Sequence, residues 1–216
     1  MRLSTLLRAL YELVLSFVAP ARCAACAAGV PLRQVFCAGC ARTIVTRAAP
    51  RGESFASVFV YGGAVARAVV RLKYDPRPDL AAPLGDLLRR GVPLLSGWAP
   101  DVVVPVPLHA SRLVSRGFNQ AALLAAPVAR ELGVPLRARG LVRTRDTPQQ
   151  ATLDRSHRLR NVRRAFAAQD TAAIAGKRVL LVDDVRTTGA TLLACEDALK
   201  AAGATEVRCL VLATSE

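Results

Sequence analysis

The sequence predicts an α/β fold, in which helices flank a parallel sheet and a small cysteine-rich module precedes it. Short, nearly continuous apolar runs alternate with longer segments of helical periodicity. Strands that are apolar on both faces are typical of parallel sheets covered by helices on both sides. Four cysteines near the N-terminus form two CxxC pairs, and 216 residues suffice for one full-size domain with a small appendage.

The elements follow one another along the chain in a regular order. Apolar runs rich in valine predict strands, and apolar residues spaced three or four apart predict helices. Gly133 and Gly203 each close a helix. The expected strands are residues 56–63, 101–107, 140–144, 178–184 and 206–214, and the expected helices are residues 64–74, 80–91, 119–133 and 190–203.

The N-terminal residues 1–23 combine basic residues with an apolar run, which is a pattern shared with signal peptides and lipoprotein signals. Glu12 interrupts the run, and the residues before Cys23 form a poor lipobox. Because leucines recur here at helical spacing, we favour an amphipathic helix packed on the rest of the protein. No run of 18 uncharged apolar residues occurs, so we expect no transmembrane segment and a cytoplasmic location.

The paired cysteines predict a metal site. Cys23 and Cys26 form one pair, Cys37 and Cys40 form the other, and ten residues lie between the two pairs. Two CxxC turns can supply the four thiolates that a structural, tetrahedral Zn²⁺ takes. The alternatives are two disulfides or a redox-active CxxC. We place the module in residues 1–50 and the main domain in residues 51–216, with the boundary in the polar stretch 46–54.

Two adjacent carboxylates, Asp183 and Asp184, follow an apolar strand and precede a hydroxylated loop and a helix start. In parallel α/β sheets ligands bind beyond the carboxyl ends of the strands. Carboxylates accept hydrogen bonds from sugar hydroxyls or hold Mg²⁺, whereas loop and helix N–H groups bind phosphate. The alternative is an ordinary strand-to-helix turn. The loop candidates are Thr187, Thr188, Gly189, Ala190 and Thr191.

This string resembles the signature of type I phosphoribosyltransferases, in which two acidic residues bind the ribose of 5-phosphoribosyl 1-diphosphate (PRPP) and the loop binds its 5′-phosphate. With "DVVVPVPLHASRLVSRGFNQ", "VRLKY" and the CxxC pairs, nearly the whole chain is similar to the ComF/GntX family of competence proteins. The resemblance implies a type I phosphoribosyltransferase fold, PRPP with Mg²⁺, and a link to DNA uptake in natural transformation. It places Leu108, His109 and Arg112 on the pyrophosphate side.

The segment 141–166 is polar and rich in arginine, and by the resemblance it matches the mobile hood loop of glutamine PRPP amidotransferase-like enzymes. Its mobile-loop candidates are Arg143, Arg145, Gln149 and Arg158. Residues 137–164 hold nine arginines against two aspartates. A charge run is ordinarily a solvated face, but an excess of one sign favours anion binding. The nucleic-acid candidates are Arg158, Arg160, Arg163 and Arg164.

Two functions remain open from the sequence. The first is an enzyme that transfers phosphoribosyl from PRPP, although no residues for an acceptor or for turnover are recognisable. The second is a noncatalytic accessory that binds single-stranded DNA and works with the DNA-uptake machinery. A net charge of +14 favours polyanionic partners. Aromatic residues make up only 5% of the chain and leave few platforms for base stacking.

Overall fold

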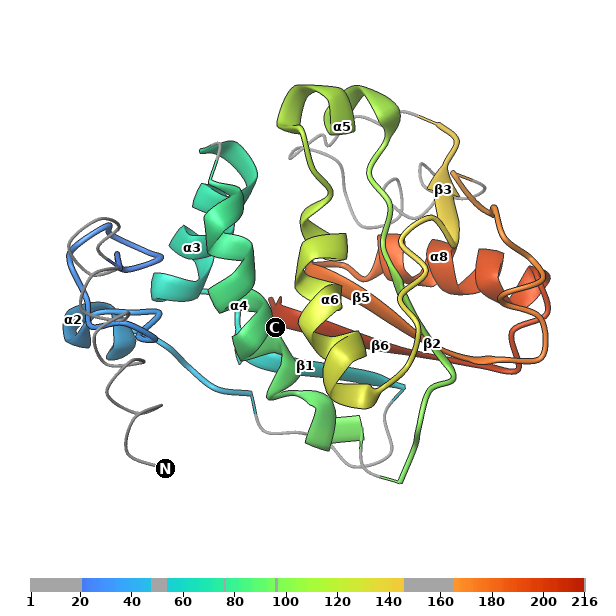
Figure 1. Cartoon of the computed structure of the whole chain (residues 1–216), viewed down its shortest axis with the longest axis horizontal. Helices are drawn as coiled ribbons and strands as arrows, with labels where there is room; N and C mark the ends of the chain where they lie inside the picture. Colours follow the sequence, from blue (N-terminus) through green and yellow to red (C-terminus); the bar gives the residue numbers. More distant parts are fainter. Residues whose placement is uncertain (1–20, 48–53, 76, 96, 146–164, 216) are drawn as a thin grey trace, which may run out of the picture.

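A computed structural model describes residues 21–47, 54–75, 77–95, 97–145 and 165–215. Its centre is a parallel sheet of four strands in the order β1-β6-β5-β2 (Figure 1). The expected N-terminal helix and most of the arginine-rich segment lie outside the described residues. The strands are β1 (Phe55–Val60), β2 (Val102–Pro105), β5 (Arg178–Arg186) and β6 (Glu206–Thr214).

Each edge of the sheet is covered by a short stretch of chain. Residues 45–47 pair antiparallel with β1, through hydrogen bonds from Arg47 N to Val58 O and from Val60 N to Val45 O. At the other edge Leu136 forms a parallel bridge with Val103. Part of the polar stretch 46–54, expected to be loop, is therefore paired with the sheet. These contacts satisfy edge N–H and C=O groups that would otherwise invite pairing with another chain.

Alternation along the central strands separates two apolar layers. Leu180, Val182, Leu210 and Leu212 face one layer, together with buried side chains of helices α3, α4 and α6. Leu181 and Val211 face the other layer, where α8 and a small hairpin lie (Figure 1). Because successive strand residues point to opposite faces, a strand buried on both sides is apolar throughout. This confirms the helix-covered parallel sheet.

The long helices occupy the expected segments, with ends displaced by a few residues at most. They are α3 (Gly63–Tyr74), α4 (Ala81–Arg89), α6 (Gln120–Leu132) and α8 (Ala190–Ala201). Gly133 closes α6 in the left-handed conformation, at a φ of 66°, and Asn119 caps its start by accepting a hydrogen bond from Ala121 N.

Helix α5 (Ala110–Arg116) is an element that the periodicity did not predict. It has seven residues and buries none of them, so it carries no apolar stripe. Residues next to the helix define both of its ends, because His109 caps the N-terminus and Gly117 ends the helix at a φ of 80°. Strand β3 (Leu141–Arg143) pairs antiparallel with β4 (Phe166–Ala168), which brackets the arginine-rich segment.

The cysteine module packs against α3 and belongs to the same apolar cluster as one face of the sheet. Cys23, Ala24, Phe36 and Cys40 are buried there with Phe59 of β1. The short helix α2 (Ala38–Ala41) carries the last cysteine, and the module lies to one side of the sheet (Figure 1). Among the described residues, no helix is both long enough and apolar enough to span a membrane.

Candidate functional site

Asp183 and Asp184 lie near the carboxyl end of β5, and both are buried. By strand alternation Asp183 continues the series of Val179 and Leu181 toward α8, whereas Asp184 continues the series of Leu180 and Val182 toward α3. Each carboxylate also accepts a hydrogen bond from the next backbone amide. Asp184 N donates to Asp183 Oδ1 at 2.8 Å, and Val185 N donates to Asp184 Oδ1 at 2.9 Å.

Lys73 in the last turn of α3 reaches this site. Its Nζ lies 2.8 Å from Asp184 Oδ2, and their side chains are 20% and 3% exposed. In the sequence Lys73 stands only within the family motif "VRLKY", which predicts no role for it. The sequence does mark Lys73 out, because only three of the 30 basic residues in the chain are lysines. The ammonium of Lys73 thereby offsets the charge of one of the two adjacent acidic groups.

The titratable groups of the site shift one another's pKa values. Burial, reinforced by the charge of Asp184, raises the pKa of Asp183 well above its ordinary value. Burial also disfavours the ammonium of Lys73, but attraction to Asp184 and Asp183 outweighs it and raises the pKa of Lys73. Buried titratable groups shifted by one another are typical of binding and catalytic sites. The arrangement can accept hydrogen bonds from a sugar while a cation remains beside it.

The loop after the carboxylates forms the start of α8. Gly189 occupies the N-cap at a φ of 78°, where no side chain caps the helix. Ala190 N donates only a long bond of 3.4 Å to Thr188 Oγ1. Open N–H groups at a helix start suit a phosphate.

Arg186 lies against this loop and has no part in the sequence prediction. A Cβ added at Gly189 would lie 3.0 Å from its Nε, and its guanidinium stacks on Phe55 with the ring centroid 4.3 Å away. Arg186 therefore adds a cation beside the expected phosphate position. Its place inside the signature string is the only signal that the sequence offered.

Helix α5 and the end of α3 face each other across a cleft of about 390 Å³. Lys73, Tyr74, Arg112, Ser115 and Arg116 line it. Arg116 donates to Gln120 Oε1 at 2.6 Å and stacks over Tyr74, while burial lowers its pKa. The cleft thus brings Lys73, the partner of Asp184, together with two arginines spaced four apart on one helix face.

Of the three pyrophosphate-side candidates, only Arg112 is among the residues that line the cleft. Arg112 lines the cleft, whereas His109 caps α5 by accepting a bond from Ser111 N, and Leu108 is half-buried beside it. Arg116, which the sequence analysis omitted, joins Arg112 in the cleft.

The mobile-loop and nucleic-acid candidates are only partly described. Arg143 stacks over Phe166 at the end of β3, and Arg145 is exposed. Outside the described residues lie Gln149, Arg158, Arg160, Arg163 and Arg164.

The four paired cysteines form a compact cluster. Their Sγ atoms all lie within 4.8 Å of one another, and Cys26 Sγ is 3.7 Å from Cys37 Sγ. Four sulfurs around Zn²⁺ at 2.3 Å would be about 3.8 Å apart, so the cluster has the size of a zinc site. All six cysteines are free thiols, which excludes the disulfide alternative in this structure. Cys195 and Cys209 lie buried in the apolar layer under α8, as expected of core thiols.

Two thiols of the cluster have pKa values shifted in opposite directions. Burial opposes ionisation of Cys23, but hydrogen bonds from the backbone around Cys37, Cys26 and Ala25 lower its pKa to about 6. Arg67 Nη2 lies 3.7 Å from Cys40 Sγ and favours that thiolate, although burial and the other thiols raise the pKa of Cys40 to about 11. The residues present therefore fit a structural Zn²⁺, which would hold all four sulfurs as thiolates.

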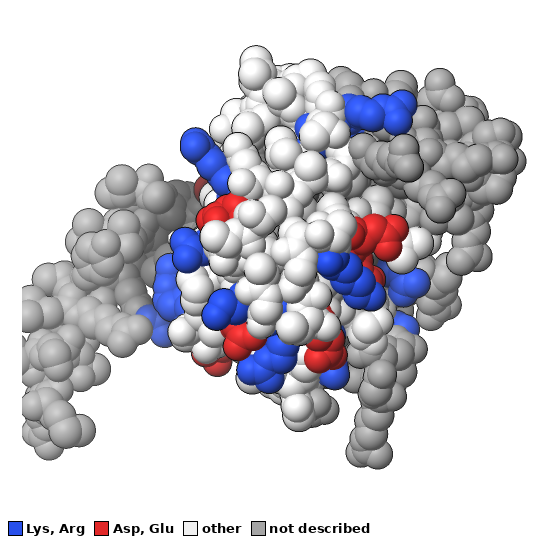
Figure 2. Space-filling model, turned by 90° about the vertical axis from the view of Figure 1, so that its right-hand side faces the viewer, with Lys and Arg blue, Asp and Glu red and all other residues white. Residues whose placement is uncertain are grey.

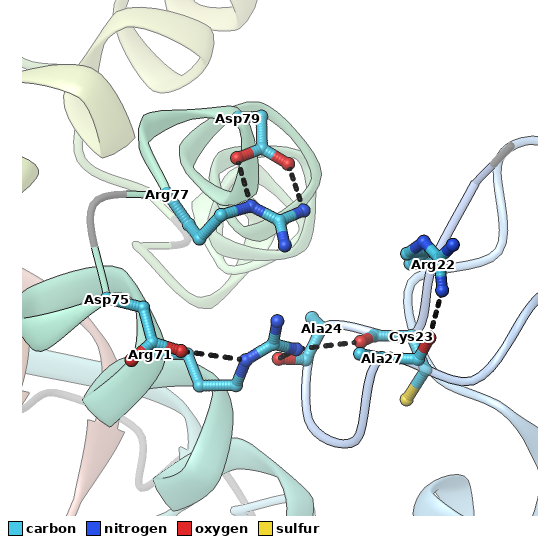
Figure 3. A network of polar contacts seen from close by, with 8 residues as sticks. All are labelled: Arg22, Cys23, Ala24, Ala27, Arg71, Asp75, Arg77 and Asp79. Atoms are coloured by element: carbon cyan, nitrogen blue, oxygen red, sulfur yellow. Dashed lines mark hydrogen bonds and ion pairs between the residues drawn. The ribbon is translucent and has the colours of Figure 1, made fainter. Parts of the chain in front are cut away.

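A second and larger cleft, of about 840 Å³, separates the module from α4. Five arginines and two aspartates are among its lining residues: Arg22, Arg33, Arg77, Arg89, Arg90, Asp79 and Asp86. Arg77 forms a two-point ion pair with Asp79, and Figure 3 shows this pair opposite Arg22 of the module. On the face seen in Figure 2, by contrast, acidic and basic side chains are interspersed over the described residues.

Comparison with known proteins agrees with this architecture. The phosphoribosyl transferase domain family matches residues 118–216, which include β5, its acidic pair and the loop before α8. Fold and site together define a protein with a phosphoribosyltransferase domain. Because the similarity to relatives extends beyond that domain, the assignment can be made narrower. The chain belongs to the ComF family, together with the DNA utilization protein YhgH and competence protein F.

The relatives cover between half and most of the chain. DNA utilization protein YhgH of Salmonella typhimurium is 32% identical over 199 residues, which cover 86% of this chain and 87% of the relative. Competence protein F of Haemophilus influenzae is 36% identical over 110 residues, covering 50% of this chain and 48% of the relative. Among solved structures, glutamine PRPP amidotransferase from B. subtilis is 26% identical with a TM-score of 0.45, over 66% of this chain and 30% of that enzyme.

Proposed function

We propose that this protein binds PRPP, or a related ribose 5-phosphate, at the carboxyl end of β5, and that it uses this site in the handling of DNA. The observation that carries the proposal is the order of groups along one short stretch. Two buried carboxylates are followed by a hydroxylated loop and an uncapped helix start. A phosphorylated ribose presents hydroxyls and then a phosphate in the matching order.

The chemistry of the surrounding side chains supports the same ligand. Asp183 and Asp184 would accept hydrogen bonds from the ribose hydroxyls, and the loop 187–191 with Arg186 would bind the 5′-phosphate. Arg112 and Arg116 lie across the cleft, where a diphosphate would meet cations. Mg²⁺ suits the oxygens of a diphosphate, and we propose it as the cofactor for PRPP binding.

The relatives' names provide the biological context. They describe DNA utilization and competence, so we propose a role in DNA uptake or use. For phosphoribosyl transfer, departure of pyrophosphate requires cations on the leaving group and negative charge near the ribose. Arg112 and Arg116 would supply the cations, and Asp183 and Asp184 would supply the negative charge.

Titration calorimetry with PRPP and Mg²⁺ tests the binding site. Asp183→Asn and Asp184→Asn each remove an ionised acceptor worth about 1.5 to 3 kcal/mol, so affinity should fall roughly 10- to 150-fold. Gly189→Val should weaken binding further, because Gly189 has a φ of 78° and faces the phosphate position. Asp197→Asn makes the same chemical change on the exposed side of α8 and should bind normally. Equal affinity in all variants would remove the sugar-binding role.

A second candidate function is binding of single-stranded DNA, which the arginine-lined cleft between the module and α4 favours. Of the aromatic residues that could stack on bases, Tyr74 is 67% exposed, whereas Phe166 is buried. In the alternative arrangement, the phosphates of the DNA backbone contact the arginine-rich segment 137–164 instead of the cleft. Both predict that log K falls with log salt by about 0.7 per phosphate contacted.

Two sets of substitutions separate these arrangements. If the segment binds phosphates, replacing Arg158, Arg160, Arg163 and Arg164 by alanine should lower affinity and flatten the salt slope. If the cleft binds them, Arg22→Ala with Arg90→Ala should do so instead. Exposed Arg130→Ala on α6 is the control. Unchanged salt slopes in both sets of variants would exclude phosphate contacts by these residues. A competition experiment, in which PRPP with Mg²⁺ is added to the protein bound to single-stranded DNA, would show whether the two ligands share a site.

A further inference from the structure

Helix α3 begins against the cysteine module. Ala64 N donates to Thr43 Oγ1 at 2.9 Å, and Thr43 Oγ1 donates in turn to Cys40 O at 2.8 Å. A Cβ added at Gly63 would lie 2.2 Å from Thr43 O. The module therefore caps the first turn of the helix and leaves no space between them.

The side of α3 is also attached to the module, through arginines spaced four residues apart. Arg71 Nη1 donates to Cys23 O at 3.1 Å and to Ala24 O at 3.0 Å, and its Nε donates to Asp75 Oδ2 (Figure 3). Arg67 approaches Cys40 Sγ. Because Cys23 and Ala24 lie in the first CxxC turn, the carbonyls that Arg71 binds keep their positions only while that turn keeps its shape.

The last turn of the same helix carries Lys73 to Asp184. Lys73 lies two positions after Arg71, which places their side chains on nearly opposite sides of the helix. The helix is thus held between the module on one side and the carboxylates on the other. It buries Val65, Val69 and Leu72, so it is packed as a rigid element.

We propose that Arg71 is a positioning residue that couples the two sites. By holding α3 on the first CxxC turn, it fixes Lys73 at Asp184, so that metal binding by the cysteines and phosphoribosyl binding by the carboxylates strengthen each other. This coupling rests on the proposed function of the carboxylate site. Thermodynamic linkage then requires the two effects to be equal in size.

Lysine-selective NMR tests the positioning without any ligand. The chain has three lysines, Lys73, Lys177 and Lys200, so the spectrum contains three side-chain signals. Arg71→Gln should move the Lys73 signal toward that of a solvent-exposed lysine and lower its titration midpoint. Arg71→Lys adds a fourth lysine signal, which is recognised by its absence from the wild-type spectrum. It keeps a donor beside the carbonyls of Cys23 and Ala24 and should restore part of the Lys73 shift. Arg130→Gln, an exposed change on α6, should leave Lys73 as it is.

Metal release and ligand affinity test the coupling. In the zinc-loaded full chain, PRPP with Mg²⁺ should weaken the transfer of Zn²⁺ to the chelator 4-(2-pyridylazo)resorcinol at equilibrium by roughly fivefold or more. Asp184→Asn should lose this protection, which controls for direct binding of Zn²⁺ by PRPP. Arg71→Gln should weaken PRPP binding and Zn²⁺ retention together, while circular dichroism confirms that the variant is folded.

The outcomes separate the coupling from the proposed function. If PRPP binds the wild type but neither protects Zn²⁺ nor depends on Arg71, the coupling is wrong and the ribose site stands. If PRPP does not bind at all, the proposed function fails and the coupling fails with it. The lysine spectrum still decides whether Arg71 positions Lys73. If Arg71→Gln does not fold, Arg71→Lys takes its place in the test. It must then show an intermediate Lys73 shift and intermediate Zn²⁺ retention, and otherwise the proposal is overturned.

Discussion

At the scale of single residues, adjacent aspartates receive different environments. Asp184 has Lys73 at 2.8 Å, whereas Asp183 is directed toward the apolar layer under α8. Burial and the charge of Asp184 raise the pKa of Asp183. The buried carboxylate of Asp183 therefore imposes a cost on folding when it ionises.

We predict that Asp183→Asn stabilises the protein at neutral pH. The raised pKa means that the folded chain binds the proton more tightly than the unfolded chain. Wild-type stability therefore falls as the pH rises from near 4, the ordinary pKa of aspartic acid, through the raised value. Asparagine cannot ionise and keeps an acceptor for Asp184 N. Thermal unfolding from pH 4 to pH 8 should show the variant gaining on the wild type as the pH rises.

Asp101→Asn is a control that should change stability at neutral pH in the opposite direction. Asp101 accepts hydrogen bonds from the side chain and amide of Arg178, which lower its pKa. It stabilises the fold above the ordinary pKa, and this contribution disappears as the pH falls through the lowered value. The Asp101→Asn variant should therefore lose stability at neutral pH. If Asp183→Asn behaves in the same way, burial does not dominate at Asp183.

At the scale of elements, α3 connects the module to the site, and its start depends on one backbone conformation. Gly63 has a φ of 50° and lies against Thr43. Gly62, its neighbour, is extended at a φ of 177° and has open space at its Cβ position. The two glycines are adjacent in sequence but have different tolerance for a side chain.

We predict that Gly63→Val destabilises the protein by about 2 to 4 kcal/mol, because it combines a left-handed backbone with a clash against a main-chain oxygen. Gly62→Val should change stability by roughly 0.5 kcal/mol or less, since an extended residue with open space tolerates a β-branched side chain. Urea unfolding of both variants measures the difference. Equal losses would show that α3 does not need this close contact with the module.

At the scale of the whole molecule, the module and one face of the sheet share an apolar cluster. Phe36 and Cys40 are buried with Phe59 and with helix α3. The second apolar layer, under α8, contains none of the module's described residues 21–47. We retain residues 1–50 and 51–216 as a proposed division, with a boundary at positions that lie outside the described residues.

We predict one Zn²⁺ per chain, bound by Cys23, Cys26, Cys37 and Cys40, and a local response to its loss. In Cys26→Ser, hydrogen exchange should rise in residues 21–47 and in α3, while β5 and β6 stay protected by the second layer. Cys195→Ala, a change in the core thiol under α8, should keep the metal. Elemental analysis that finds no stoichiometric zinc in reduced protein would contradict the site.

The sequence by itself determined the elements and the groups that carry chemistry. Apolar runs in β2, β5 and β6 predict buried strands, because a strand covered on both faces has no polar positions. CxxC spacing predicts the sulfur cluster, since each turn brings two thiols to one point. The acidic pair and the loop 187–191 are contiguous, so local order alone brings them together.

The tertiary structure decided which distant residues complete the site. Lys73 and Arg116 lie in separate helices, and only packing of α3 and α5 around the end of β5 brings both toward Asp184. Periodicity did not reveal α5, because a helix of seven residues that buries none of them has no apolar pattern. The contact of Arg71 with Cys23 spans 48 positions along the chain. Such pairings depend on how helices pack, and no local pattern encodes that packing.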